Sequence, residues 1–261
     1  MTKRRYSTDL TDAQWKLIKP HLPHETTGRP RRVRTRCILN ALWYVLATGT
    51  PWRLLPHEFP KWPLVYYYFR RWSRLGYWKR TYHVLRALWR QRTGRHKHPT
   101  AGCQDSQSVK SAAGPGERGY DANKKVKGRK RHLLCDTQGL PLAVVVTSAE
   151  VSDSAGAHRL WARLGRRRGV TKKLRKVWVD AGYKTGIQET CAHRYGVTME
   201  VVVKPPEQKG FAVQPRRWVI ERSFAWMISQ RRLVRDYEVL PLHSENMVWI
   251  AFLRLVLRRL D

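Results

Sequence analysis

The chain has 261 residues, enough for one large domain or two smaller ones with apolar cores. Its 52 Lys and Arg against 19 Asp and Glu give a formal net charge of +33, which favours a nucleic acid as partner over a membrane surface. No apolar run approaches the ~20 residues needed to cross a bilayer, and the basic start lacks the apolar segment of a secretory signal. Four scattered cysteines without a C-x-x-C pair argue against a structural zinc site and indicate a reduced, intracellular protein.

Charge and tryptophan are unevenly distributed along the chain. The first 100 residues hold 22 Lys and Arg against 4 Asp and Glu, and 7 of the 12 tryptophans. The segment 92–102, RTGRHKHPTAG, has the composition of a linker. We therefore expect two domains, at 1–98 and 99–261.

The front of the chain reads as helical. We expect helices at 10–22, with Thr11 as N-cap, at 34–49, ending at Gly49, and at 64–76 and 77–94. The last pair resembles a helix-turn-helix, with Arg70 and Arg71 facing DNA. A solvated basic helix with core aromatics is an equally weighted alternative.

The back of the chain alternates strands and helices and predicts an α/β fold in the order β-β-β-α-β-α-β-α. The predicted strands are 102–109, 129–139, 141–149, 176–182 and 197–204. The predicted helices are 154–165, 185–196, 216–233 and 242–260. A mixed sheet with strand order 3-2-1-4-5 would make the first and fourth strands neighbours.

Several acids in the back have structural explanations. Asp136 precedes Thr-Gln-Gly between two hairpin strands and is expected to form a turn. Asp153, or Ser152 before it, is expected to cap a helix. Asp121 lies in a basic loop and is expected to be solvated.

Three other acids stand apart. Asp105 interrupts the first strand, Asp180 ends the fourth, and Glu221 lies in an aromatic and basic helix. If these carboxylates cluster, their repulsion favours a bound cation, and hard oxygen ligands suit Mg²⁺ or Mn²⁺. Two such ions support phosphoryl transfer. Spacing alone weighs this hypothesis evenly against three unrelated polar residues.

Several stretches together resemble a known family. They are LTDAQWKLIKPHLP, GTPWRLLP and VYYYFRRW in the front and QDSQSVKS, GRKRHLLCDTQGLPLAVVVTSAEVSD, VWVDAGY and RRWVIERSFAWM in the back. The chain is similar to DDE transposases of bacterial insertion sequences, in the insertion-sequence-five group. The resemblance implies a ribonuclease-H-like mixed sheet, preceded by an all-helical DNA-binding region.

The resemblance also implies chemistry. Asp105, Asp180 and Glu221 become the catalytic, metal-binding triad for Mg²⁺ or Mn²⁺. The implied enzyme cuts double-stranded DNA at terminal inverted repeats and joins the freed 3′ ends to target DNA. It would act in the bacterial cytoplasm at the nucleoid, as a homodimer, because two ends must be held together.

A family signature of Tyr, Arg, Glu and Lys surrounds the glutamate. Arg217 and Glu221 fit it, whereas Gln214 and Ile228 replace the Tyr and the Lys. Arg217 lies one helical turn before Glu221, where it would contact a phosphate or hold the glutamate. Arg222 is a further candidate DNA contact.

The stretch 120–132 is rich in cations and is predicted to contact the DNA backbone. Its candidate residues are Lys124, Lys125, Lys127, Arg129, Lys130 and Arg131. A solvated hairpin edge is the alternative. His132 is expected to be structural, and Tyr183 either to pack near the site or to stack on a base.

Two rival functions remain at the level of sequence. One is an inactive DNA-binding derivative, although all three acids are present. The other is a metal-dependent nuclease without strand joining.

Overall fold

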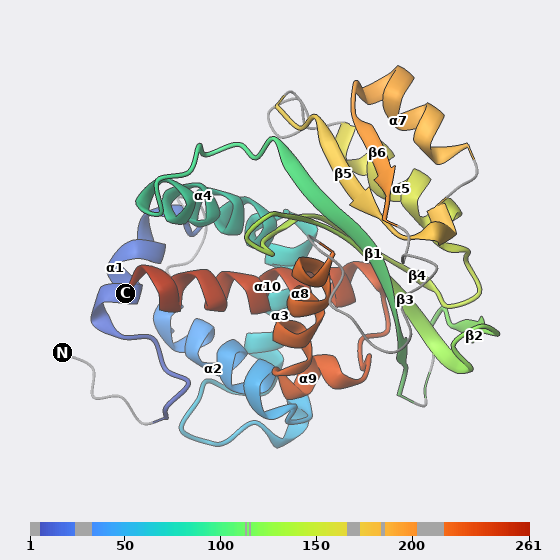
Figure 1. The fold of residues 1–261 in the computed structure, drawn as a ribbon. Coiled ribbons are helices and arrows are strands. Elements are labelled where there is room, and N and C mark those ends of the chain that lie inside the picture. The colour runs from blue at the N-terminus through green and yellow to red at the C-terminus, as the bar shows by residue number, and fades with distance from the viewer. Residues whose placement is uncertain are drawn as a thin grey trace. The chain divides into compact units, whose positions relative to one another are not determined.

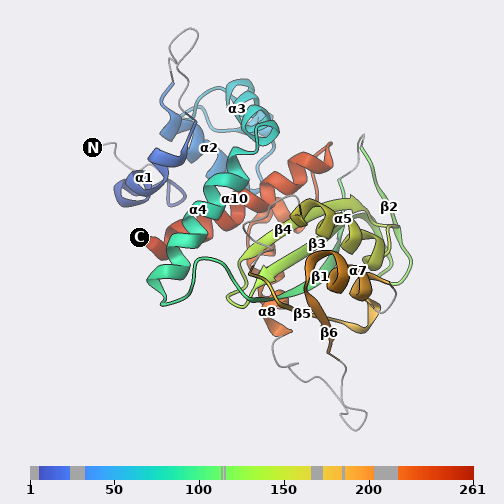
Figure 2. The same ribbon diagram turned by 90° about the horizontal axis from the view of Figure 1, so that it is seen from above.

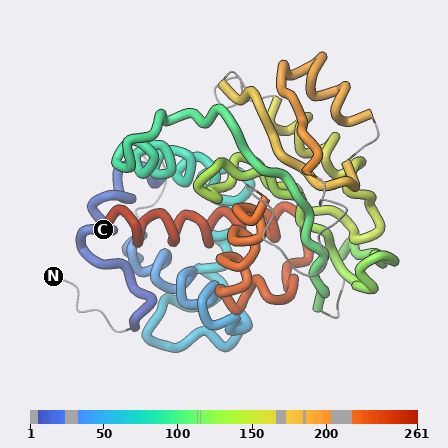
Figure 3. Tube along the Cα trace, in the orientation of Figure 1, coloured from blue at the N-terminus to red at the C-terminus, as the bar shows by residue number. Residues whose placement is uncertain are grey.

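The computed structural model describes residues 6–23, 33–112, 114, 116–165, 173–183, 186–202 and 217–261. The chain divides into two compact units. One comprises Met1–Arg95, Met227–Arg235 and Leu242–Asp261, and the other His96–Trp226 and Asp236–Pro241. The division after Arg95 lies close to the predicted one at 98. The C-terminal helices, however, belong to the first unit, so the chain returns to that unit near its end (Figure 3).

The first unit is helical. Its elements are α1 (Asp12–Ile18), η1 (Lys19–His21), α2 (Thr35–Thr48), η2 (Trp52–Leu54), α3 (Trp62–Arg74), α4 (Tyr77–Arg92), α9 (Arg231–Val234) and α10 (Pro241–Leu260). Thr11 caps α1 with a capping box, and Gly49 ends α2 at φ 74°, both as predicted. In the part of the chain that the structure describes, no helix is both long and apolar enough to span a bilayer.

Aromatic side chains build the core of this unit around α10. Tyr82 of α4 packs against Trp249, with ring centroids 5.2 Å apart, and Phe69 of α3 packs against His243 at 5.3 Å. Trp72 and Phe69 are fully buried, so the apolar stripe of α3 faces inward. Its arginines are left on the outer face.

The second unit is built on one mixed sheet (Figure 1). The strands are β1 (Ala101–Lys110), β2 (Gly119–Asp121), β3 (Val126–Asp136), β4 (Pro141–Ser148), β5 (Lys176–Val179) and β6 (Thr198–Val201). The long strand β1 pairs antiparallel with β3 and parallel with β5, and β5 pairs parallel with β6. Both β2 and β4 pair with β3. The first and fourth predicted strands are therefore neighbours, as expected.

Two local predictions were wrong. The hairpin of β2 with β3 was not foreseen, and β3 begins at Val126 rather than at residue 129. The predicted helix 216–233 is interrupted, because α8 (Trp218–Ile228) ends before Gln230, whose backbone is extended. The side chain of Gln230 accepts a hydrogen bond of 2.7 Å from Arg254, which helps to hold this break.

Helices α5 (Asp153–Gly165) and α7 (Ile187–Tyr195) share an apolar core with the sheet (Figure 2). Trp161 and Leu160 of α5 and Ile187 of α7 are fully buried in it. A Cβ at Gly156 would lie only 2.0 Å from the ring of His132, so α5 approaches β3 closely at this point.

Candidate active site

The pairing of β1 with β5 brings two of the three predicted acids to adjacent strands. Cys103 lies opposite Trp178 in the parallel register, and Asp105 and Asp180 each follow two residues later. Strand β5 ends at Val179, and the chain turns away through η3 (Ala181–Tyr183). The backbone N–H of Gly182 donates to Oδ1 of Asp180 at 3.0 Å and fixes that side chain at the end of the strand.

Asp105 sits in a largely desolvated position. Its side chain is only 15% exposed, and Oδ1 accepts a hydrogen bond of 2.7 Å from the backbone N–H of Ser106. Burial, helped by the charge of Asp180, raises the pKa of Asp105 to about 6, against the opposing effects of the Ser106 N–H, Arg217 and Lys124. Desolvation of the carboxylate is thus the main cause of the shift.

The third acid, Glu221, lies near Asp105 because both contact Arg217. Nη2 of Arg217 lies 3.8 Å from Oδ2 of Asp105 and 3.7 Å from Oε1 of Glu221. Glu221 is in the first turn of α8 and its side chain is 51% exposed. The three predicted acids therefore gather in one region of the second unit, with one guanidinium between two of them.

The donor set fits a divalent cation chemically. All three side chains offer carboxylate oxygens, the ligands that Mg²⁺ and Mn²⁺ prefer. Across the described ranges, no three His, Cys, Asp or Glu side chains are close enough to enclose an ion as they stand. In this structure the guanidinium of Arg217 contacts both Asp105 and Glu221. The two carboxylates can approach a shared ion only if this guanidinium moves out of the space between them.

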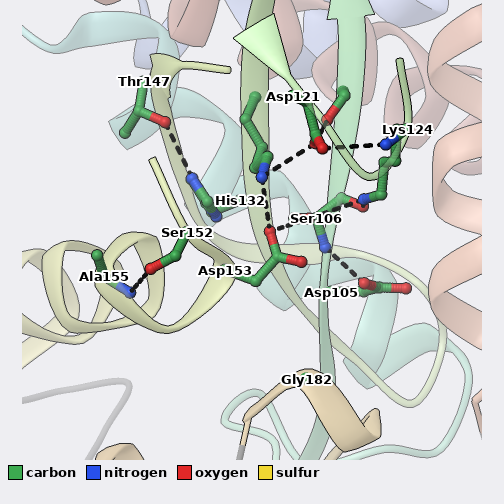
Figure 4. A network of polar contacts seen from close by, with 12 residues as sticks. Asp105, Ser106, Asp121, Lys124, His132, Thr147, Ser152, Asp153, Ala155 and Gly182 are labelled. Carbon is green, nitrogen blue, oxygen red and sulfur yellow. Dashed lines mark hydrogen bonds and ion pairs between the residues drawn. The ribbon is translucent and has the colours of Figure 1, made fainter. Parts of the chain in front are cut away.

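A buried polar network supports the strand that carries Asp105 (Figure 4). The hydroxyl of Ser106 donates to Asp153 at 2.6 Å, and that of Ser108 donates to Asp121 at 2.6 Å. The ammonium of Lys130 lies 3.1 Å from Asp121 and 3.2 Å from Asp153. Lys130 thereby joins the two carboxylates that hold alternate residues of β1.

The structure corrects one prediction here and decides between two candidate caps of α5. Asp121 is only 4% exposed rather than solvated; burial opposes its ionisation, but hydrogen bonds from Ser108 and from Lys124 and Lys130 lower its pKa to about 2. The cap of α5 is Ser152, whose Oγ accepts from the N–H of Ala155 at 3.2 Å. The burial of Asp121 was not predicted, because the short strand β2 that ends at this residue was not recognised in the sequence.

Three of the six cations predicted to touch DNA from the stretch 120–132 are internal. Arg129, Lys130 and Arg131 are between 1% and 5% exposed, because every residue of β3 from 128 to 136 is buried. Arg129 donates to the carbonyls of Glu117, Glu238 and Val239. Their burial argues against the predicted DNA contacts.

The other three cations of that stretch lie at the turn of the β2–β3 hairpin. The side chains of Lys124, Lys125 and Lys127 are exposed. They are thus placed to meet a ligand from solvent, whereas the cations that follow them in β3 are not.

Arg222 has an internal structural role. Its guanidinium lies over the rings of Trp218 and Trp226, at 4.3 and 4.8 Å from their centroids, and donates to the carbonyl of Gln138 at 3.1 Å. It thus ties α8 to the turn between β3 and β4.

The remaining predicted residues divide by exposure. Arg70 and Arg71 lie on the outer face of α3 and are exposed. His132 is 1% exposed, with its Nε2 3.1 Å from the Thr147 hydroxyl, as its predicted structural role requires. Tyr183 is fully buried in the core, so it packs rather than stacks on a base. Asp136 accepts from the N–H groups of Gln138 and Leu140, which confirms its turn.

Two family models match the chain in sequence. Residues 96–257 match "Transposase DDE domain", and residues 10–82 match "Putative transposase of IS4/5 family". The first match spans more than half of the chain, so the chain belongs to the DDE transposases of the IS4/5 type. Transposases act on DNA, and DDE domains generally use divalent metal ions.

One relative is found in Burkholderia cepacia. It is described as "Putative transposase for insertion sequence element IS402", and the two sequences are 31% identical over 115 residues. The match covers 42% of this chain and 54% of the relative, so the chain spans about half the length of the curated relative it matches. The chain has a helical region followed by strands and helices of an α/β unit, the order that the resemblance to DDE transposases implied.

Proposed function

We propose that this chain cleaves DNA at the terminal inverted repeats of an insertion sequence and joins the freed 3′ ends to target DNA. The observation that carries the proposal is that Asp105 and Asp180 lie on adjacent strands while Arg217 contacts both Asp105 and Glu221, in a chain of the DDE family. A ribonuclease-H-like catalytic core is part of this proposal.

Asp105, Asp180 and Glu221 would hold two Mg²⁺ or Mn²⁺ ions. Bound there, the ions would activate the attacking oxygen and stabilise the leaving one in phosphoryl transfer. Asp105 lies within β1 and Asp180 directly follows the neighbouring strand β5, which limits changes in their spacing, whereas Glu221 is half exposed on α8 and adjusts more easily. Water is the nucleophile for cleavage, and the 3′-hydroxyl is the nucleophile for joining.

Arg217 holds Asp105 and Glu221 together by its charge before the ions bind. On loading, its guanidinium is free to turn to a DNA phosphate, which would reconcile the two roles considered for it. The exposed arginines of α3 supply the charge for binding duplex DNA in the helical unit. A homodimer would bring two element ends together.

An end-cleavage and joining assay tests the proposal. The purified chain is incubated with Mg²⁺, labelled element ends and a target plasmid. Asp105→Asn keeps the size of the side chain and removes its charge, so we expect cleavage to be lost while DNA binding persists. Normal cleavage by this variant would contradict the assignment of Asp105.

The same assay separates the rival functions. Nicked ends without joined product would support a metal-dependent nuclease. DNA binding by the unaltered chain without any cleavage, in Mg²⁺ or Mn²⁺, would support an inactive derivative.

A further inference from the structure

One cation of the hairpin turn is folded back onto the strand that carries Asp105. Lys124 follows β2, and its backbone N–H donates to Oδ1 of Asp121 at 3.1 Å. Its ammonium donates to both the carbonyl and the hydroxyl oxygen of Ser106, each at 3.2 Å. Ser106 is the residue whose N–H binds the carboxylate of Asp105. Figure 4 shows the Lys124 ammonium reaching β1 beside Asp105.

The ammonium of Lys124 binds neutral oxygens rather than an acid. Within the described part of the chain, no ion pair joins its ammonium to a carboxylate, and its two hydrogen bonds go to the oxygens of Ser106. The nearby carboxylates of Asp121 and Asp153 are already paired with the buried Lys130. The positive charge of Lys124 is therefore held against β1 at the residue that follows Asp105.

The turn that carries Lys124 is held in place. Asp121 is anchored by the hydroxyl of Ser108 and by the ammonium of Lys130, and it in turn binds the Lys124 N–H. Lys125 next to it takes a left-handed backbone at φ 52°, which fixes the course of the chain. An exposed lysine is normally a mobile point charge, but this one is pre-organised next to the carboxylates.

We propose that Lys124 is a catalytic residue that donates a hydrogen bond to a non-bridging oxygen of the phosphodiester bound at Asp105. The inference rests on the proposed function and deepens it. Two of the three N–H donors of the ammonium are directed at Ser106, which leaves one for the phosphate. Lys125 and Lys127, which have no such anchor on β1, serve to bind the DNA backbone only.

The step needs no additional reactant. In cleavage, the oxygen of water forms a bond to phosphorus as the bond to the 3′ oxygen breaks. The water proton leaves to solvent, and the 3′ oxygen takes up one proton to become the 3′-hydroxyl. Negative charge grows on the non-bridging oxygens, where a fixed cation stabilises the transition state more than the ground state. Lys124 keeps its proton throughout.

Single-turnover cleavage of a labelled element end by the full chain tests the inference. Lys124→Met removes the charge with little change in length, and Lys110→Met is the matched control at the exposed end of strand β1. We expect Lys124→Met to lower the cleavage rate at saturating DNA by about 100-fold. The dissociation constant for the same DNA should change by less than about threefold, because one phosphate contact among many is lost. Lys110→Met should cleave at the unaltered rate.

Two further measurements separate a catalytic role from a structural one. Lys124→Arg should restore at least a tenth of the rate, since it returns the charge, and the melting temperatures of all three variants should match that of the unaltered chain. Equal rates for Lys124→Met and the unaltered chain would overturn the inference while leaving the proposed function intact. A rate loss that accompanies a lowered melting temperature and is not rescued by Lys124→Arg would also overturn it. Failure of the unaltered chain to cleave would instead remove the proposed function.

Discussion

Two basic stretches of this chain look alike in sequence and end in opposite environments. In β3, Arg129, Lys130 and Arg131 are buried, and carboxylates and carbonyls from other segments of their unit satisfy the first two. In α3, Arg70 and Arg71 stand on the outer face while Phe69 and Trp72 face the core. A strand covered on both faces buries every side chain, whereas a helix with one apolar stripe leaves its other face in water.

A run of basic residues does not by itself define a DNA-binding surface. The deciding factor is whether acids lie within reach in the folded unit. Asp121 pairs with Lys130 within the β2–β3 hairpin, whereas Asp153 and Asp236 come to the cations of β3 from segments further along the chain. Changes in the β3 stretch should therefore alter stability, and changes in the α3 stretch should alter DNA binding.

The largest effect is expected from Lys130→Met. The substitution leaves the buried carboxylate of Asp121 and the partly exposed one of Asp153 without their shared cation, and breaking a buried pair typically costs about 3–5 kcal/mol. Urea unfolding at pH 7 measures the loss. Lys127→Met, at an exposed position of the same hairpin, should stay within about 0.5 kcal/mol of the unaltered chain. A loss below about 1 kcal/mol for Lys130→Met would show that the buried ion pairs are not structurally required.

The next largest effect is a pH dependence of folding stability caused by His132. This residue comes directly after Arg131 in β3. Burial lowers its pKa to about 4 from 6.5, opposed by Asp153 and reinforced by Lys130, Lys124 and Arg159. Between these pH values the unfolded chain binds a proton that the folded chain does not. His132 therefore does not reduce the free energy of unfolding above pH 6.5. As the pH falls to 4, it lowers this free energy by up to about 3 kcal/mol.

Comparison with His132→Gln isolates this contribution from that of the titrating acids. We expect the difference in unfolding free energy between the two proteins to shift by about 2 kcal/mol between pH 7.5 and 4.5. Parallel pH profiles of the two proteins would mean that the imidazole is protonated in the fold or is not buried.

A smaller effect is expected from Gly156→Ala, which tests how tightly α5 closes over the β3 stretch. A helical Gly→Ala change normally stabilises by up to about 1 kcal/mol. Here the added Cβ would meet the His132 ring at 2.0 Å, so we expect a loss of about 1–3 kcal/mol by urea unfolding. In a His132→Ala background the same change should be neutral or stabilising, because the ring is gone. Equal losses in both backgrounds would place the strain elsewhere.

The smallest effect on stability is expected from Arg70→Gln on α3. Its guanidinium is exposed and lies over the ring of Tyr66, so unfolding should change by less than about 0.5 kcal/mol. A plot of the logarithm of the DNA-binding constant against the logarithm of the salt concentration should instead become shallower by about one unit of slope, because one phosphate contact is removed. An unchanged salt dependence would move the DNA-binding face away from this part of α3.

Much of the local structure was predictable. Thr11, Gly49 and Asp136 act through backbone groups within a few residues, so their cap and turn roles could be read from short stretches. The strands carrying Asp105 and Asp180 were also found, because apolar runs and strand ends are local signals. The short strand β2 was missed, since its three residues are too few to show an alternating pattern.

The family, the excess of basic charge, most elements and three candidate acids could be read from the linear sequence. Each of these depends on composition, on motifs or on residues close in the chain. The folded chain was needed to show that Lys130 joins Asp121 to Asp153, that Arg217 contacts both Asp105 and Glu221, and that Lys124 turns back to Ser106. These pairings depend on which strands are neighbours and on which charges share buried space. A linear pattern of charges contains neither kind of information.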